Sequence, residues 1–170
     1  ANHGQERKYH HKLIGCNSRL DTLHAAVLDV KLNHIDEFTA ARQIVAAKYD
    51  GALASCEQLV LPRKSAFSTH VYHQYTIRLK SAGDITDTAK YRESLQASLK
   101  EKGIPTMVYY PLPLQAQDAY KWMARTPGNM DEAARLSQCV LSLPIHTEMT
   151  GEEQEYIIDT LLKELQDRKI

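Results

Sequence analysis

The amino-acid sequence predicts an α/β fold, in which long helices are followed by a small α+β domain. Two observations support this fold class. No proline or glycine interrupts residues 20–50, and apolar residues recur there at three- and four-residue spacing, as in a helix. Later in the chain, the patterns follow in the order strand, helix, strand, helices, strand, helix, which is typical of a small sheet covered on one face.

The first part of the chain is expected to be a polar segment followed by helix. Residues 1–19 are rich in histidine and lysine and indicate an irregular segment, whose polar start suggests a truncated chain, and Asp21 can cap the helix that follows. The helical stretch forms one long helix or two abutting ones. Its apolar residues lie on several sides, so we expect it to pack against a missing domain or a partner subunit. They are Leu20, Leu23, Val27, Leu28, Val30, Leu32, Ile35, Phe38, Ala41, Val45, Tyr49 and Ala52.

Strand patterns appear after residue 57. Residues 59–62 form a short extended piece, and residues 71–79 alternate between apolar and polar side chains with a period of two. One face of this longer strand is expected to carry Val71, Tyr75, Ile77 and Leu79. Residues 106–110 and 140–143 predict further strands.

Helix signals separate these strands. A helix over residues 87–102 is stopped by Gly103 and Pro105. Two shorter helices follow, the second opened by residues 129–132, whose spacing of cap and glutamate is typical of a helix start. The last helix begins with a capping box at residues 150–153. Its inward side chains are expected to be Ile158, Leu161 and Leu165.

Composition narrows the class of partner and the compartment. Lysine plus arginine and aspartate plus glutamate both number 21, so the formal net charge is zero. Nucleic acid and anionic membranes favour a basic excess, so neither is expected as a partner. No apolar run approaches the roughly 20 residues that span a bilayer. The three cysteines, Cys16, Cys56 and Cys139, are widely spaced, which favours a reduced cytoplasmic setting.

Several motifs of catalytic and metal sites do not occur in the sequence. The seven glycines form neither GxGxxG nor GxxxxGKS or GxxxxGKT, so a self-contained nucleotide site is unsupported. Four histidines crowd the start, but no pair has HExxH spacing, and histidines in a polar loop are usually solvated. We therefore expect no metal at His3, His10, His11 and His24.

Two short patterns can bind a ligand, and each also has a simpler structural explanation. Tyr109 and Tyr110 end a strand, so one ring should enter the core while the other can donate to a phosphate or sugar oxygen. Aromatic residues also simply favour strands. Asn17 and Arg19 precede a helix N-terminus, which favours anions such as phosphate. Alternatively, they are a helix cap and a surface arginine.

An ordered set of short sequence words runs along nearly all 170 residues. They are residues 3–5, 9–11, 15–21, 25–28 and 31–32, Arg42 with Tyr49, residues 70–72 with Tyr75, 103–106, 109–111, Gln117 with Tyr120, and 141–144. Together these words resemble the DegT/StrS family of sugar aminotransferases. Within that family the chain is most similar to members that aminate UDP-2-acetamido-2-deoxy-3-oxo-glucuronate for surface-polysaccharide synthesis.

The resemblance implies the C-terminal domain of a fold-type-I transferase that depends on pyridoxal 5'-phosphate, preceded by long connecting helices. Residues 1–56 would be a loop and long helices from the edge of the large cofactor domain. Residues 57–170 would be the small C-terminal α/β domain. The resemblance also implies a homodimer whose subunits complete each other's active sites.

The same resemblance implies roles for the two patterns described above. Asn17 would reach the cofactor phosphate of the neighbouring subunit, and Arg19 would support that edge. Tyr109 and Tyr110 would line the sugar-nucleotide pocket. A UDP-linked keto-sugar and an amino donor such as glutamate would be the substrates, and the cofactor would act as an electron sink for the amino group.

Departures from the family limit what can be carried over. Many relatives have histidine where Tyr109 and Gln115 stand, which would alter the sugar preference. Lys8, Lys12 and Lys31 lie downstream of the place where the family has its Schiff-base lysine, so we expect these 170 residues alone to be inactive. Two alternatives remain open: a non-catalytic binding or dimerisation module, and part of a sugar dehydratase of the family in which histidine replaces that lysine.

Overall fold

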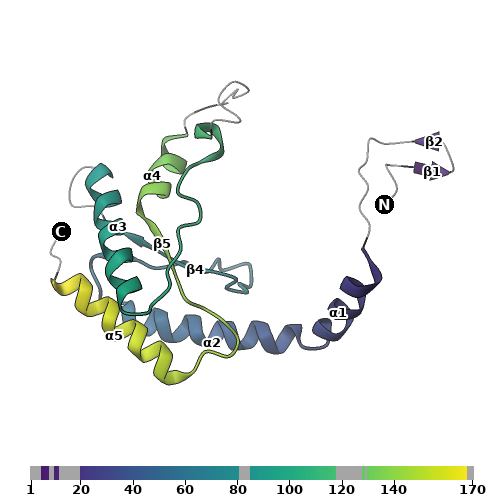
Figure 1. The fold of residues 1–170 in the computed structure, drawn as a ribbon, viewed down its shortest axis with the longest axis horizontal. Helices are drawn as coiled ribbons and strands as arrows, with labels where there is room; N and C mark the ends of the chain where they lie inside the picture. The colour runs from purple at the N-terminus through teal and green to yellow at the C-terminus, as the bar shows by residue number, and fades with distance from the viewer. Residues whose placement is uncertain are drawn as a thin grey trace. The chain divides into compact units, whose positions relative to one another are not determined.

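The structure, a computed structural model, describes residues 5–7, 10–11, 20–80, 85–117, 128 and 130–167. The chain divides into two compact units, Ala1–Phe38 and Thr39–Ile170, which are described separately (Figure 1). The assignment of residues 1–56 to the edge of a larger domain, and of residues 57–170 to a small one, stays a prediction.

Two short strands and a helix are found among the described residues of the first unit. Strands β1 (Gln5–Arg7) and β2 (His10–His11) pair in antiparallel fashion, so the expectation of an irregular segment is wrong for these residues. Their polar side chains give no alternating apolar pattern, and such a pairing rests on backbone hydrogen bonds. Helix α1 (Thr22–Leu32) is capped by Asp21, whose side chain accepts a 3.0 Å hydrogen bond from the backbone N–H of His24, as expected.

The large apolar side chains of α1 are exposed. The long helical stretch is two abutting helices, α1 and α2 (Ile35–Leu53), with a turn at Asn33 and His34 between them. No residue of α1 is buried. The exposed apolar side chains of this region are Leu20, Leu23, Val27, Leu28, Val30, Leu32, Ile35 and Phe38. The apolar surface that the sequence predicts for the first helix is therefore present and open.

The second unit is built on a three-stranded antiparallel sheet. Its strands are β3 (Leu59–Val60), β4 (Tyr75–Leu79) and β5 (Val140–Leu143), in the order β3-β4-β5. Tyr75 pairs with Leu143 and Ile77 with Leu141, which places all four side chains on the buried face. On the opposite face, the hydroxyls of Thr76 and Ser142 share a 2.8 Å hydrogen bond.

The strand expected over residues 71–79 begins only at Tyr75. Tyr72 has a positive φ of 46°, which interrupts the extended backbone and its alternation of faces. As a result, Tyr72 is buried, and the side chain of Val71 is 54% exposed. The expectation that Val71 lies on the inner face is therefore wrong.

The strand expected over residues 106–110 is reduced to one bridge. Met107 donates its N–H to the carbonyl of Ser142 over 3.2 Å and accepts from the N–H of Ser142 over 2.7 Å. Pro105 and Pro111 flank this stretch and cannot donate backbone hydrogen bonds, which limits the ladder to its centre.

The described residues of the second unit contain four further helical segments. They are α3 (Ile85–Glu101), the 3-10 turn η1 (Leu114–Ala116), α4 (Asp131–Cys139) and α5 (Gly151–Asp167). Helix α3 ends before Gly103, whose φ of +76° suits glycine and whose N–H donates to Lys100. Helix α4 begins within residues 129–132, as predicted, but its N-cap is Met130 and makes no side-chain cap bond; Asn129 lies outside the described residues.

The predicted capping box opens α5. The backbone N–H of Thr150 donates to the carboxylate of Glu153 over 2.8 Å, and the N–H of Glu153 donates to the hydroxyl of Thr150 over 3.2 Å. The inward positions expected for this helix, Ile158, Leu161 and Leu165, are all buried.

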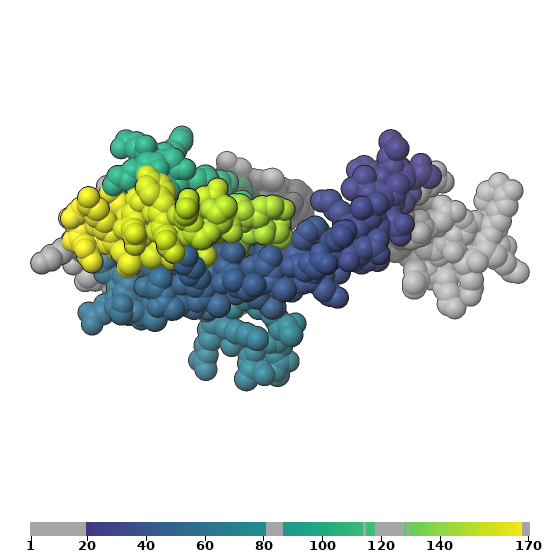
Figure 2. All heavy atoms as spheres, turned by 90° about the horizontal axis from the view of Figure 1, so that it is seen from below, coloured from purple at the N-terminus to yellow at the C-terminus, as the bar shows by residue number. Residues whose placement is uncertain are grey.

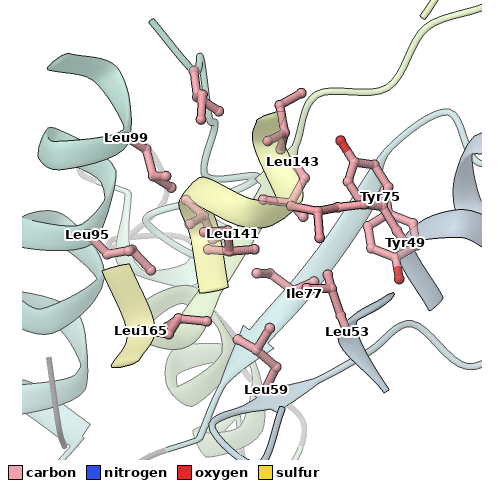
Figure 3. Close-up of a cluster of buried hydrophobic side chains, with 14 of the residues drawn as sticks. Tyr49, Leu53, Leu59, Tyr75, Ile77, Leu95, Leu99, Leu141, Leu143 and Leu165 are labelled. Atoms are coloured by element: carbon pink, nitrogen blue, oxygen red, sulfur yellow. The ribbon is translucent and has the colours of Figure 1, made fainter. Parts of the chain in front are cut away.

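One cluster of buried side chains joins the helices to the sheet (Figure 3). Apolar burial is the main force that holds such a unit together, at about 1.5–3 kcal/mol for each large side chain. The members labelled in Figure 3 are Tyr49 and Leu53 of α2, Leu59 of β3, Tyr75 and Ile77 of β4, Leu95 and Leu99 of α3, Leu141 and Leu143 of β5, and Leu165 of α5.

Helices α2 and α5 lie side by side in the second unit, as Figures 1 and 2 show. Buried Gln154 of α5 donates a 2.7 Å hydrogen bond to the carbonyl of Val45 in α2. Lys48 of α2 donates to the carbonyl of Gly151 and to the carboxylate of Glu155. Among the helices that the structure describes, none has both the length and the apolar character of a membrane span.

Candidate functional site

A hollow of about 410 Å³ opens on the second unit. Its walls come from α2, from the segment that precedes β4, from the stretch that follows Gly103, and from the segment that follows β5. The polar side chains at these walls include Arg42, His73, His146 and Tyr109. Pockets of a few hundred cubic ångströms with a few convergent polar groups are typical small-molecule sites.

Tyr109 and Tyr110, the expected substrate contacts, are both accessible. Tyr109 lines the hollow and is 39% exposed, whereas Tyr110 is 75% exposed and is not part of the lining. Their rings lie 6.0 Å apart in an edge-to-face arrangement, and the peptide bond between them is cis. The expectation that one ring enters the core is wrong, because no regular strand extends to these residues and the alternation of faces does not apply.

Arg42 of α2 contacts two walls of the hollow at once. Its Nη1 atom donates to the carbonyls of Tyr72 and His73, each at 3.3 Å, and to the carbonyl of Ile145 at 3.2 Å. Sequence reasoning gave Arg42 no role in a site and noted it only as part of the family resemblance. Its partners lie 30 and 103 positions away, so no local sequence pattern reveals these contacts. The side chain places a permanent positive charge beside the two histidines of the hollow.

Tyr49 and Tyr75 form a tilted pair of rings that is linked to the lining of the hollow. The hydroxyl of Tyr49 donates a 2.9 Å hydrogen bond to the carbonyl of Pro144, which is itself part of the lining. The Tyr49 ring lies 4.9 Å from the ring of Tyr75. Burial raises the pKa of both phenols above the ordinary value for tyrosine, and for Tyr75 the hydrogen bond to Asp50 raises it further. Both groups therefore stay protonated and serve as hydrogen-bond donors.

The described lining of the hollow supplies no amine for a Schiff base with pyridoxal phosphate, because no lysine is among its residues. The residues expected to contact the cofactor, Asn17 and Arg19, lie outside the described residues. The described ranges also contain no group of three or more histidine, cysteine or acidic side chains placed to hold a metal ion.

Comparison with known proteins defines the family to which this chain belongs. The profile of the DegT/DnrJ/EryC1/StrS aminotransferase family matches residues 1–162. The chain belongs to this family, and the resemblance drawn from its ordered sequence words is confirmed.

Individual relatives show how much of a family member is present. The chain is 42% identical to UDP-2-acetamido-2-deoxy-3-oxo-D-glucuronate aminotransferase of Pseudomonas aeruginosa, covering 86% of this chain and 37% of that protein. It is 40% identical to the pleiotropic regulatory protein of Geobacillus stearothermophilus, covering 94% of this chain and 41% of that protein. The chain therefore spans about two fifths of the length of the relatives that it matches.

Solved structures confirm the predicted fold class. A DegT DnrJ EryC1 StrS aminotransferase from Brucella abortus matches 95% of this chain and 40% of its own, with a TM-score of 0.78 and 33% identity. DesV of S. venezuelae matches 99% of this chain and 43% of its own, with a TM-score of 0.81 and 32% identity. The chain thus has the fold of one part of the sugar aminotransferases of fold type I.

Proposed function

We propose that these residues belong to a pyridoxal-phosphate-dependent aminotransferase that transfers an amino group to a UDP-linked keto-sugar in surface-polysaccharide biosynthesis. The 42% identity to the P. aeruginosa enzyme supports the choice of UDP-linked sugar over other nucleotide sugars. Glutamate is the proposed amino donor, and the proposed form is a cytoplasmic homodimer. Pyridoxal phosphate supplies the reversible attachment of the amino group.

The observation that carries the substrate assignment is the position of Tyr109 in the wall of the hollow. A phenol there can donate to a phosphate or sugar oxygen, and Arg42 adds positive charge for the diphosphate of a nucleotide sugar. Tyr110 is exposed beside it and is proposed as a second substrate contact. Asn17 and Arg19 are proposed to bind the cofactor phosphate.

The Schiff-base lysine is proposed to lie outside these 170 residues, which by themselves are expected not to transaminate. The proposal for the whole protein is tested by incubating it with pyridoxal phosphate, glutamate and the UDP-linked 3-oxo-glucuronate. Formation of the amino sugar supports the proposal. Dehydration of the keto-sugar would contradict the proposal and support the sugar dehydratase. The absence of any turnover would contradict it and support the non-catalytic module.

The role of the hollow is tested on this chain by titration with UDP. NMR signals of the Tyr109 and Tyr110 rings are expected to shift on addition of UDP, and Tyr109→Phe is expected to weaken binding by about fivefold to tenfold, the loss of one hydrogen bond. Tyr156→Phe is the matched control, because this exposed tyrosine does not line the hollow. Equal UDP affinity in the wild-type and Tyr109→Phe chains would contradict the assignment.

A further inference from the structure

Two chain segments that lie far apart in the sequence both line the hollow. One precedes β4 and contributes His73, and the other follows β5 and contributes His146. Neither segment belongs to a strand or a helix, so the regular ladder does not hold their peptide groups in place. Backbone carbonyls in such segments need other donors, because an unpaired carbonyl removed from water is unfavourable.

The guanidinium of Arg42 supplies that donor for both segments. Its Nη1 atom contacts the carbonyls of Tyr72 and His73 in the first segment and of Ile145 in the second, at 3.2–3.3 Å. Two of these three carbonyls belong to the residue directly before a histidine of the hollow. A charged donor makes such hydrogen bonds stronger than neutral pairs. One side chain of α2 therefore ties together the backbone of both segments that line the hollow.

Neighbouring contacts show that α2 as a whole shapes these segments. Gln43 donates a 3.0 Å hydrogen bond to the carbonyl of His70, and the N–H of Tyr72 donates to Nδ1 of His70 over 2.9 Å. Tyr49 holds the carbonyl of Pro144 in the second segment. Of these α2 side chains, Arg42 contacts both segments and also lines the hollow.

We propose that Arg42 is the positioning residue of the hollow, which fixes the separation of His73 and His146 and thereby the shape of the site that receives the nucleotide sugar. The identity of the ligand rests on the proposed function. The contacts that hold the two segments do not depend on which ligand binds, so the positioning role of Arg42 and the identity of the ligand can be tested separately.

The positioning role is tested first on the ligand-free 170-residue chain by NMR. Arg42→Met keeps an unbranched apolar side chain and removes the hydrogen-bond donors. Arg42→Lys keeps the positive charge but replaces the planar guanidinium with a single ammonium group. The signals to follow are the backbone amides of His73, Gln74 and His146, each of which shares a peptide group with one of the three carbonyls. All three are expected to shift in Arg42→Met and to shift less in Arg42→Lys.

Lys48→Met is the matched control, because Lys48 is a cation of the same helix that donates to the carbonyl of Gly151 and does not line the hollow. This variant is expected to move the amide of Glu152 and to leave the three amides of the hollow unchanged. Unchanged amide signals of His73 and His146 in both Arg42 variants would overturn the proposal. If Arg42→Met does not fold, Arg42→Lys alone decides.

The second measurement is the dissociation constant for UDP, taken well below the unfolding temperature of each variant. Arg42→Met is expected to weaken UDP binding about tenfold or more, Arg42→Lys is expected to be intermediate, and Lys48→Met is expected to match the wild type. Shifted amides with an unchanged UDP affinity would overturn the positioning role. If the wild-type chain does not bind UDP, the proposed ligand fails, and the amide signals still decide whether Arg42 positions the two segments.

Discussion

The hydroxyl of Tyr75 donates a 2.6 Å hydrogen bond to Oδ1 of Asp50, and this bond joins the central strand β4 to helix α2. The Tyr75 ring is fully buried and lies against the ring of Tyr49 on the same helix. A phenol and a carboxylate thus meet at the edge of an apolar cluster, where each satisfies the polar group of the other. The pair gives the buried Tyr75 a polar contact that leucine could not make.

Replacement of Tyr75 by phenylalanine tests the value of this pair. Tyr75→Phe is expected to lower the free energy of unfolding by about 1–3 kcal/mol, because it leaves a partly buried carboxylate without its donor. Urea unfolding measures the loss. Tyr156→Phe removes a 3.0 Å hydrogen bond at an exposed site and should cost less. A Tyr75→Phe chain as stable as the wild type would show that water replaces the phenol at no cost.

The buried phenols also predict how stability depends on alkaline pH. Burial raises the folded-state pKa of Tyr49 and Tyr75 above the unfolded value of about 10. The folded chain therefore keeps these protons to higher pH than the unfolded chain does, and their contribution is fully present below about pH 10 and is lost as pH rises above it. Unfolding measured between pH 8 and roughly 11 should show this decline, with a shallower slope in Tyr75→Phe. If stability falls with pH equally steeply in both proteins, the ionisation of Tyr75 does not contribute to the decline.

The capping box of α5 predicts two effects, a loss of stability when Thr150 is replaced and a dependence of stability on acidic pH. Thr150→Ala removes the hydroxyl that accepts from the Glu153 N–H and should lower the free energy of unfolding by about 1 kcal/mol. Hydrogen bonds from Thr150, first from its backbone N–H, lower the pKa of Glu153. That contribution is present above the unfolded pKa of about 4.3 and is lost as pH falls through the folded value. Glu153→Gln should therefore reduce the dependence of the free energy of unfolding on pH in the acidic range. An unchanged dependence would show that Glu153 does not cause it.

The core predicts a large penalty for a cavity under α5. Leu161 is fully buried, so Leu161→Ala should lower the free energy of unfolding by about 2–5 kcal/mol. Leu23→Ala in α1 serves as the control, since Leu23 is exposed and its replacement should change stability by less than about 0.5 kcal/mol. Similar costs for the two variants, measured by urea unfolding, would mean that Leu161 is not in a close-packed environment.

The open apolar side chains of α1 predict self-association. None of the residues of this helix is buried, and exposed apolar surface of this kind favours contact with another chain. Sedimentation of the 170-residue chain should show dimers or larger species, and Val27→Glu should shift the distribution toward monomer. A wild-type chain that sediments as a monomer would contradict this prediction.

Local patterns in the sequence were sufficient to predict most helices and the inner face of the sheet. The capping box at Thr150, the glycine stop at Gly103, and the inward positions Ile158 and Leu161 all depend on neighbours within a few residues. For this reason they can be recognised without knowledge of the tertiary structure.

The parts that could not be predicted depend on contacts across the fold. In the sequence, the alternation of apolar and polar residues predicts a strand that starts at Val71, but the positive φ of Tyr72 interrupts it. Gln43 and Arg42 of α2 hold the backbone around Tyr72. Tyr109 faces a hollow instead of the core because the strand before it is only one bridge long. No pattern of spacing in the sequence encodes either contact.

The Met107 bridge also has a consequence for how copies of this chain can meet. Strand β5 is paired with β4 on one side, and at Ser142 the other side is already occupied by the backbone of Met107, while β3 at the opposite border is only two residues long. In the described part of this three-stranded sheet, little unpaired peptide backbone is left to template the growth of a shared sheet. Self-association of this chain should therefore proceed through helices, and concentrated solutions should not form the fibrils that stain with thioflavin.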